Sequence, residues 1–375
     1  MNKATKCVHE GTYHDPKTGG VNTPIFTSSA FEYVDREQVH YPRYFNTPNQ
    51  ESVIRKLSSL EGSEDGILFS SGMAAISTSI FSFAGAGDHV VLLDNLYGGT
   101  YAFATDMFHD FGIKHSFVPS TVEAIQQALT PSTKVIVIET PSNPLLNVID
   151  IARVADLAKE NGITTIIDNT FASPINQTPI HFGVDVVVHS GTKYLGGHSD
   201  LCCGVALASR EHSAKIRSRA CHLGGSLNAS TSYLLERSLK TLALRVEQQS
   251  DNALALARFL DDHPAINKVN YPGLQNFHGH EIAKKQMNKY GGMLSFVLNS
   301  SSNQTAEFIS RLQFIHCAVS LGGVETLICS PAQTSHAKMS ADERKRVGIS
   351  DALLRLSVGI EHIDDLIADI GHALR

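Results

Sequence analysis

The fold is decided by the stretch between residues 134 and 194, which contains KVIVIET (134–140), VIDIARVADLAKENG (148–162), TTIIDNT (164–170) and DVVVHSGTKY (185–194). Three of these segments are short apolar runs typical of buried strands. The second has the period of an amphipathic helix, with Gly162 past its end. Strands that alternate with helices form βαβ units, whose right-handed crossovers place helices on both faces of the sheet. The stretch therefore predicts an α/β fold with a mostly parallel sheet.

The same pattern extends outward and then changes. On the N-terminal side, ESVIRKLSSLEG (51–62) predicts another amphipathic helix, with Gly62 as its C-cap. Beyond about residue 245, helical segments alternate with strand-like runs such as MLSFVLN (293–299). We therefore expect a large domain at 46–245 and a smaller α/β domain at 246–375.

The first 45 residues predict an arm. Residues 1–45 are rich in Gly, Pro, Thr and aromatic residues and have no sustained helical period. An extended segment of this length is unusual inside a compact domain, so it is better explained if it packs on another subunit. The sequence therefore predicts self-association.

Composition excludes several classes of protein. The chain has 375 residues, with 31 Lys and Arg against 37 Asp and Glu, a net charge of −6, and 42% hydrophobic residues. Disordered chains have fewer apolar residues. A protein that binds nucleic acid through general basic charge would carry an excess of cations. We therefore expect a globular protein without a nucleic-acid partner.

The cysteines and the N-terminus predict a cytoplasmic protein. The six cysteines form no CxxC pair, so neither a zinc spacing nor a small disulfide framework is visible. His278 and His280 in FHGH do not have a common ligand spacing, and no metal is expected. The first 20 residues have no apolar core, and no apolar stretch approaches the ~20 residues of a membrane helix.

Polar side chains follow four of the apolar runs. Ligands of open α/β sheets bind beyond the carboxyl ends of the strands, so these positions are candidates for a site. They are Asp94, Asn95 and Tyr97, then Glu139 and Asn143, then Asp168, Asn169 and Thr170, and finally His189, Ser190, Thr192 and Lys193.

Two familiar nucleotide motifs are absent, and a weaker anion site is present. The one GxG, at Gly85 and Gly87, precedes a strand and lacks the third small residue of a dinucleotide fingerprint. No GxxxxGK[ST] P-loop exists. In SSGMAAI (70–76), the backbone N–H groups of Gly72 and Met73 would form an anion site at a helix N-terminus, although a cap without a ligand is the commoner case.

Seven segments carry a resemblance when they are taken together. They are SSGMAAI (70–76), LYGGT (96–100), ETPSNP (139–144), DNTF (168–171), HSGTKYLGGHSD (189–200), AVSLGGVETL (318–327) and RLSVGIE (355–361). In this order they resemble the cystathionine γ-synthase, cystathionine γ-lyase and methionine γ-lyase family of fold-type I pyridoxal-phosphate enzymes. The resemblance covers nearly the whole chain, and it implies pyridoxal 5'-phosphate as the cofactor.

The resemblance implies roles for individual residues. Lys193 matches the lysine that binds the cofactor aldehyde as a Schiff base, and Asp168 matches the carboxylate that pairs with the pyridine nitrogen. Tyr97 matches the tyrosine that stacks on the ring and is a proposed acid for the leaving group, which needs a lowered pKa. The phosphate would be held by Gly72, Met73, Ser190 and Thr192.

Further matches concern the subunit interface and the substrate. Tyr41 and Arg43 resemble a Tyr-x-Arg that reaches the phosphate of a neighbouring subunit, which implies a homodimer at least and favours a homotetramer. The family usually has NPT soon after this arginine, whereas this chain has Asn46-Thr47-Pro48. Arg355 matches the arginine that binds the substrate carboxylate, and Asn143 and Ser320 match residues near that carboxylate and the cofactor.

The reaction within the family stays open at this stage. Members that handle cystathionine often have Glu where this chain has Val319, and methionine γ-lyases are similar to it in carrying Val. Methionine γ-lyases, however, typically have Cys where this chain has Gly99. We expect a C–S lyase that acts at Cγ of a sulfur amino acid.

Several alternatives to this reaction remain. Within the family they are γ-replacement, as in cystathionine γ-synthase or O-acylhomoserine sulfhydrylase, and cystathionine β-elimination. A non-catalytic binding relative is the alternative from another class, although the chain retains Lys193, Asp168 and Tyr97.

Overall fold

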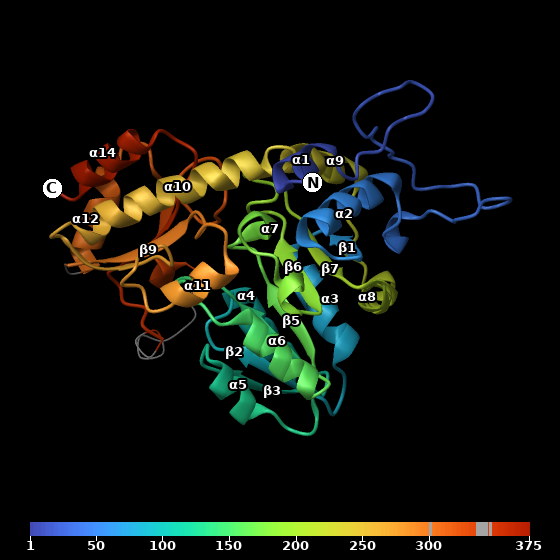
Figure 1. Cartoon of the computed structure of the whole chain (residues 1–375), viewed down its shortest axis with the longest axis horizontal. Coiled ribbons are helices and arrows are strands. Elements are labelled where there is room, and N and C mark those ends of the chain that lie inside the picture. The colour runs from blue at the N-terminus through green and yellow to red at the C-terminus, as the bar shows by residue number, and fades with distance from the viewer. Residues whose placement is uncertain (300–301, 335–343, 345–346) are drawn as a thin grey trace.

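The computed structural model describes residues 1–299, 302–334, 344 and 347–375. Its larger sheet confirms the mostly parallel sheet that the sequence predicts, because among its described strands only β7 runs in the direction opposite to the others (Figure 1). Across the sheet the order is β1 (Asp65–Phe69), β7 (Gly204–Ala208), β6 (Val186–Ser190), β5 (Thr164–Asp168), β4 (Thr133–Glu139), β2 (His89–Leu93) and β3 (Lys114–Val118).

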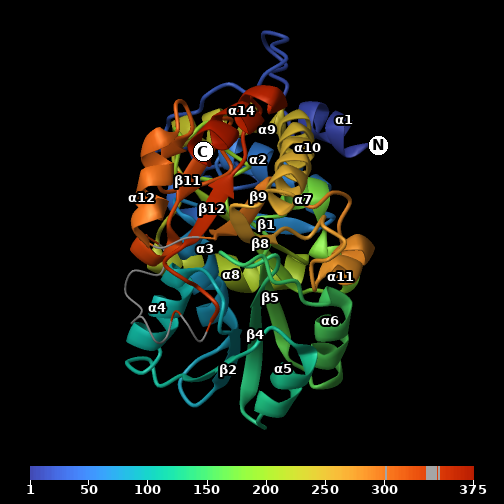
Figure 2. The ribbon, with the colours of Figure 1, turned by 90° about the vertical axis from the view of Figure 1, so that its left-hand side faces the viewer.

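Helices cover both faces of this sheet, and Figure 2 shows α4 on one side of the strands and α6 on the other. The apolar residues of β2, β4, β5 and β6 are buried between these layers. The helices are α2 (Pro48–Glu61), α3 (Gly72–Phe83), α4 (Gly98–Met107), α5 (Val122–Ala128), α6 (Ile151–Glu160), α7 (Ser173–Asn176), α8 (Arg210–Leu223) and α9 (Ala229–Leu239).

The C-terminal part of the chain forms a second, smaller sheet. Its order is β10 (His316–Cys317), β11 (Leu327–Cys329), β12 (Leu353–Ser357), β9 (Met293–Leu298) and β8 (Ile266–Asn270). The described helices beside it are α11 (His280–Gln286), α12 (Ser302–Arg311) and α14 (Ile363–Ala373). This confirms the smaller α/β unit that the sequence predicts at the C-terminal end.

One long helix, α10 (Leu242–Asp261), joins the two parts. It contacts α1 (Lys3–His9), α7 and α9 on one side and β8, β9 and α14 on the other, and Figure 1 shows it running along the top of the molecule. The expected domain boundary at 245 falls within this helix, so the division at 46–245 and 246–375 stays a prediction.

The arm is extended over most of its length but starts with a helix that the sequence pattern did not predict. In α1 (Lys3–His9) the side chain of Cys7 is fully buried. Lysines fasten the helix to the body, since Lys6 Nζ donates to Ser59 O at 2.7 Å and Lys56 Nζ donates to Cys7 O at 3.0 Å. The helix has only 7 residues, which is too short for a clear apolar period.

The departure at Asn46-Thr47-Pro48 has a local structural explanation. Thr47 is the N-cap of α2 and Pro48 is its first residue, the positions where Thr and Pro are favoured. Thr47 N donates to the Gln50 side chain at 3.0 Å, and Asn46 Oδ1 accepts from Tyr41 N at 2.9 Å. The three residues therefore start the helix and hold the end of the arm against it.

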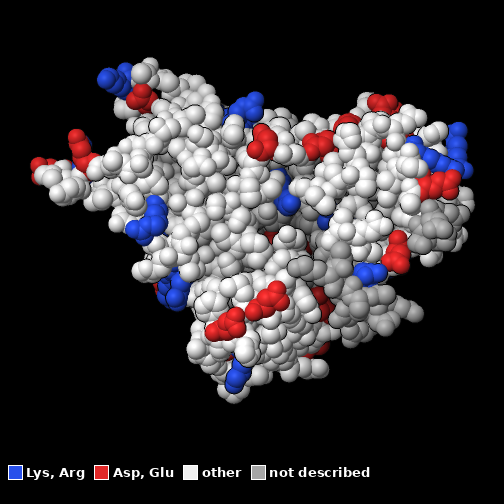
Figure 3. All heavy atoms as spheres, turned by 180° about the vertical axis from the view of Figure 1, so that it is seen from behind, with Lys and Arg blue, Asp and Glu red and all other residues white. Residues whose placement is uncertain are grey.

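One face of the molecule carries charges of both signs. Lys and Arg are interspersed with Asp and Glu over the face shown in Figure 3. Within the residues that the structure describes, no helix has the length and hydropathy that a membrane span needs. The same residues contain no group of three or more His, Cys, Asp and Glu side chains placed to hold a metal ion.

Candidate active site

The carboxyl ends of β4, β5 and β6 meet at one edge of the large sheet. Glu139 and Asp168, the last residues of β4 and β5, are in register with each other. β6 ends at Ser190, where the chain turns so that Lys193 N donates to Ser190 O at 3.1 Å. Two carboxylates, a hydroxyl and an amine therefore gather where the sequence predicts a site.

Lys193 lies in a tight, buried turn. Gly197 N donates to Lys193 O at 2.7 Å, which closes the turn. The amine itself, Lys193 Nζ, donates to Ser320 Oγ at 3.0 Å. Burial lowers the pKa of Lys193 below its ordinary value, and the nearby Arg355 cation lowers it further. The lysine is thus held in a setting that favours its neutral, nucleophilic form.

Arg355 joins the same cluster from the small domain. It lies on β12 and is 6% exposed. Its Nη1 donates to Asn143 Oδ1 at 3.1 Å and its Nη2 donates to Ser320 O at 2.9 Å, while Nε is buried without a partner. Ser320 has a φ of 79°, which an L-residue rarely adopts, so the loop that carries it is strained. Lys193, Asn143, Ser320 and Arg355 therefore form one connected group.

The two carboxylates at the sheet edge differ in their surroundings. Burial raises the pKa of Glu139 well above its usual range, and the neighbouring Asp168 raises it further. Glu139 accepts from Tyr97 N at 2.6 Å and from Asn143 N at 3.2 Å, so its role is to hold two loops. Burial also raises the pKa of Asp168, although the hydrogen bonds from Thr170 and the nearby His189 and Lys193 oppose this. A cation placed beside Asp168 would therefore be strongly favoured.

α3 starts at the position where SSGMAAI predicts an anion site, and the binding of an anion there stays a prediction. Gly72 and Met73 are the first two residues of this 12-residue helix, so their N–H groups have no acceptor within it. A Cβ atom at Gly72 would lie 2.8 Å from Ser190 Cβ, so only glycine lets this backbone approach Ser190 so closely. Thr192 follows Ser190, and its Oγ1 donates to Cys203 O at 3.3 Å.

Tyr97 precedes α4 and stands over the same edge. Its side chain is 46% exposed. A Cβ atom at Gly99 would lie 2.5 Å from Tyr97 Cε1 and 3.1 Å from Met73 Sδ, so the ring folds back over Gly99. The glycine at this position is therefore what allows the observed place of the ring.

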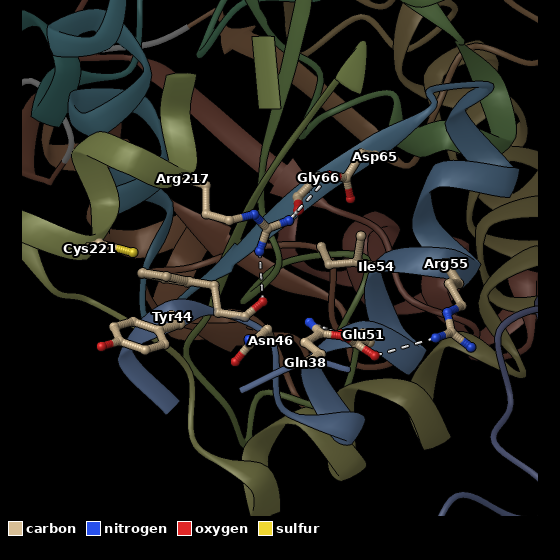
Figure 4. A pocket seen from close by; sticks show the side chains of 11 residues that line it. Gln38, Tyr44, Asn46, Glu51, Ile54, Arg55, Asp65, Gly66, Arg217 and Cys221 are labelled. Carbon is tan, nitrogen blue, oxygen red and sulfur yellow. Dashed lines mark hydrogen bonds and ion pairs between the residues drawn. The ribbon is translucent and has the colours of Figure 1, made fainter. Parts of the chain in front are cut away.

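Tyr41 and Arg43 lie elsewhere in this single chain. Arg43 Nη1 donates to Cys221 O at 2.7 Å, and its guanidinium lies 5.7 Å from the centre of the Tyr41 ring. Beside them a cavity of about 480 Å³ opens between the arm, α2 and α8, and Figure 4 shows Tyr44, Arg217 and Cys221 around it. This cavity is separate from the Lys193 cluster, and the reach of the two residues to a partner subunit stays a prediction.

Val319 precedes Ser320 and is 67% exposed, so it lies at the rim of the cluster.

Behind the sheet edge, His189 Nε2 and Glu61 Oε2 lie 3.0 Å apart and are buried. The sequence analysis named His189 but not Glu61, because no local pattern connects residues that are 128 positions apart.

Comparisons with known proteins cover the whole chain. A family model described as "Cys/Met metabolism PLP-dependent enzyme" matches residues 4–375. The chain is 44% identical over 379 residues to the cystathionine gamma-lyase of Bacillus subtilis, with 100% of this chain and 99% of that protein covered. It is 43% identical to the cystathionine beta-lyase of Lactococcus lactis subsp. cremoris, with 99% and 98% covered. The solved structure of cystathionine gamma synthase from Xanthomonas oryzae pv. oryzae has a TM-score of 0.96 at 37% identity, with 100% and 98% covered.

Proposed function

Because the chain belongs to the family of Cys/Met metabolism PLP-dependent enzymes, we propose that it is a lyase that cleaves the Cγ–S bond of a sulfur amino acid. The products are 2-oxobutanoate, ammonia and a thiol. The observation that carries this proposal is the contact of 3.0 Å between Lys193 Nζ and Ser320 Oγ, in a loop whose carbonyl accepts from Arg355. It brings an amine that can accept a proton next to a guanidinium that can bind a carboxylate.

The side chains at the sheet edge fit pyridoxal phosphate. The start of α3 with Ser190 and Thr192 would hold the phosphate, and Lys193 would hold the aldehyde carbon. Asp168, whose pKa is raised because burial disfavours its negative charge, would hold the protonated ring nitrogen. When bound there, the cofactor supplies an electron sink that acidifies the C–H bonds of the amino acid.

The chain's own groups then act on the substrate. Arg355 would bind the substrate carboxylate, with Asn143 and Ser320 fixing the direction of the guanidinium. Lys193 Nζ would accept the proton from Cα and pass it on to the cofactor. Neutral again, it would then accept the proton from Cβ, whose removal elimination at Cγ requires. Tyr97 would stack on the ring and donate a proton to the departing thiolate.

The arm supports a site that is shared between subunits. Tyr41 and Arg43 are exposed in the single chain, and the one hydrogen bond described for the Arg43 guanidinium goes to Cys221 O at 2.7 Å. In a homodimer or homotetramer these residues would contact the phosphate bound by the partner subunit. We also infer a cytoplasmic location, as the sequence predicts.

A second candidate is β-elimination of cystathionine. It is supported by the 43% identity to a protein named cystathionine beta-lyase, nearly as high as the 44% identity to a cystathionine gamma-lyase. β-Elimination needs only the proton at Cα and gives pyruvate, whereas γ-elimination gives 2-oxobutanoate. γ-Replacement would consume an activated homoserine and a thiol without releasing ammonia.

Product analysis separates these reactions. The purified enzyme is incubated with methionine, cystathionine, cysteine or an O-acylated homoserine, each with and without added cysteine, and oxo acids, ammonia and thioethers are measured. We expect 2-oxobutanoate and ammonia in equal amounts from a Cγ–S substrate. Pyruvate as the main product from cystathionine would establish the second candidate instead.

A further inference from the structure

One face of α10 carries a buried polar stripe. Arg245, Gln249 and Asn252 follow one another at spacings of four and three, so they share a helix face, and their exposed fractions are 4%, 0% and 2%. The helix runs from the large domain to the small one along the top of Figure 1. Buried polar side chains need hydrogen-bond partners, and these three side chains find theirs in or beside the segments that carry Lys193, Ser320 and Arg355.

Arg245 is bonded to the turn that carries Lys193. Its Nη1 donates to Tyr194 O at 2.8 Å. Its Nη2 donates to Leu195 O at 3.5 Å and to Ser238 O, in α9, at 3.0 Å. In the part of the chain that the structure describes, no carboxylate pairs with this guanidinium. Burial lowers the pKa of Arg245 to about 10, so it stays charged at neutral pH. Because a buried guanidinium needs acceptors for its N–H groups, it holds the backbone carbonyls that it bonds in fixed positions.

Glycine accommodates this arrangement in the turn. Gly197, which ends the turn, has a φ of +67°, and a Cβ atom there would lie 1.9 Å from Arg245 Nη1. The arginine and the turn are therefore fitted against each other so closely that no side chain can come between them.

Gln249, one helical turn further along, is bonded to the loop that carries Ser320. Its Nε2 donates to Gly323 O at 2.6 Å. Asn252 continues the stripe, because its Nδ2 donates to Gly359 O at 3.1 Å and to Glu361 O at 2.8 Å, just beyond the strand that carries Arg355. The same helix face thus holds a segment beside each substrate-binding residue of the small domain.

The two held segments also touch each other. Val324 N donates to Gly197 O at 3.0 Å. A Cβ atom at Gly322, whose φ is +77°, would lie 2.7 Å from Tyr194 N. The lysine turn and the Ser320 loop are therefore packed backbone to backbone, with α10 bonded to both.

We propose that Arg245 and Gln249 are positioning residues, which set the place of Lys193 relative to Ser320 and Arg355 by holding the two segments from one rigid helix. The proposal rests on the proposed role of Lys193. Arg245 and Gln249, one helical turn apart, hold the two sides of the site. A shift of either segment would therefore change the distance between the Lys193 amine and the Cα and Cβ atoms of the substrate.

Two conservative variants and two matched controls test this. Arg245→Lys keeps the charge but replaces a planar fork by a single ammonium, which cannot bond Tyr194 O and Ser238 O together. Gln249→Glu keeps the shape but replaces the donor to Gly323 O by an acceptor. Arg258→Lys and Glu247→Gln are similar changes at exposed positions of the same helix.

The readouts are hydrogen exchange of the holoenzyme, the visible absorbance of the bound cofactor, and steady-state kinetics per cofactor-loaded subunit. We expect exchange in the Lys193–Gly197 turn and in residues 320–324 to rise on the order of tenfold in Arg245→Lys and Gln249→Glu. We expect kcat to fall about ten- to hundredfold in Arg245→Lys with KM little changed, and KM to rise in Gln249→Glu, because its loop holds the carboxylate-binding group. The controls should match wild type.

The proposal is wrong if both variants melt at lower temperature while exchange in the two segments, kcat and KM stay at wild-type levels. If Arg245→Lys does not fold, Gln249→Glu alone decides in the same way. Loss of the proposed function would be seen differently, as full turnover by Lys193→Ala, and the exchange result needs no substrate.

Discussion

The sheet edge and the arm are built in opposite ways. At the edge, the chain bonds its own turn, with Gly196 N donating to Gly191 O at 2.8 Å and Gly197 N to Lys193 O at 2.7 Å. In the arm, Tyr33 and Val34 are 71% and 64% exposed, and large apolar side chains face outward. The edge is therefore bonded within one chain, whereas the arm leaves large apolar side chains uncovered in one chain, which is what the proposed contact with a second subunit would change.

The largest expected effect comes from breaking the edge. Replacement of Lys193 by Ala removes the amine that bonds Ser320 Oγ at this edge and can accept a proton. We expect turnover to fall at least about a thousandfold, because both the covalent anchor and the proton acceptor are lost. The measurement is oxo-acid release together with the visible absorbance of the purified protein. Full activity of this variant would refute the assignment.

The arm side of the comparison is tested by Arg43→Ala. If Arg43 binds the phosphate held by a partner subunit, its loss should lower turnover about a hundredfold, since one member of a buried charge pair is removed. We expect the variant to fold, because the one hydrogen bond described for the Arg43 side chain, at 2.7 Å, goes to Cys221 O, and the side chain lies at the surface.

Mixing the two inactive variants sharpens the same test. Random reassembly of Lys193→Ala and Arg43→Ala chains gives hybrids in which one of two sites has both good halves. About a quarter of wild-type activity should return if the sites lie between two subunits. A fully active monomer in sizing experiments would exclude a shared site.

The two regions also differ in how far the sequence could predict them. The apolar runs and the polar residues that follow them sufficed for the large sheet and for Glu139, Asp168 and Lys193, since parallel strands bring their carboxyl ends together. The sequence could not predict Glu61 behind His189 or Arg245 behind Tyr194, because contacts between distant segments leave no periodic signal. It also missed α1, whose 7 residues are too few for a period.

A smaller effect is expected at the rim. Val319 is 67% exposed beside Ser320, where an apolar side chain offers no partner to a distal ammonium. We expect the wild type to prefer substrates with uncharged tails, and Val319→Glu to shift the ratio of kcat/KM toward cystathionine by about ten- to hundredfold. Val319→Gln, which has a similar shape without the charge, is the control. A wild type that already strongly favours cystathionine over methionine would show that Val319 is not the discriminator.

The smallest expected effect concerns the stability of the cofactor-free protein. Burial lowers the pKa of Lys193 in the folded chain below the value of about 10.4 that it has when unfolded. Between these two values the unfolded chain binds more protons than the folded chain, so stability rises with pH through that window. On the acid side of this window the cost of burying the ammonium is largest, so at about pH 7 Lys193→Met should unfold at a higher denaturant concentration than wild type.

This advantage of Lys193→Met should shrink as the pH approaches about 10, because the wild-type amine then loses its proton and its cost. The measurement is the denaturation midpoint of both cofactor-free proteins at about pH 7 and about pH 9.5. Lys134→Met, a change at an exposed lysine of β4, controls for the substitution itself and should show little pH dependence. An advantage that is equal at both pH values would mean that Lys193→Met gains stability from better packing, and that the desolvated charge contributes nothing measurable.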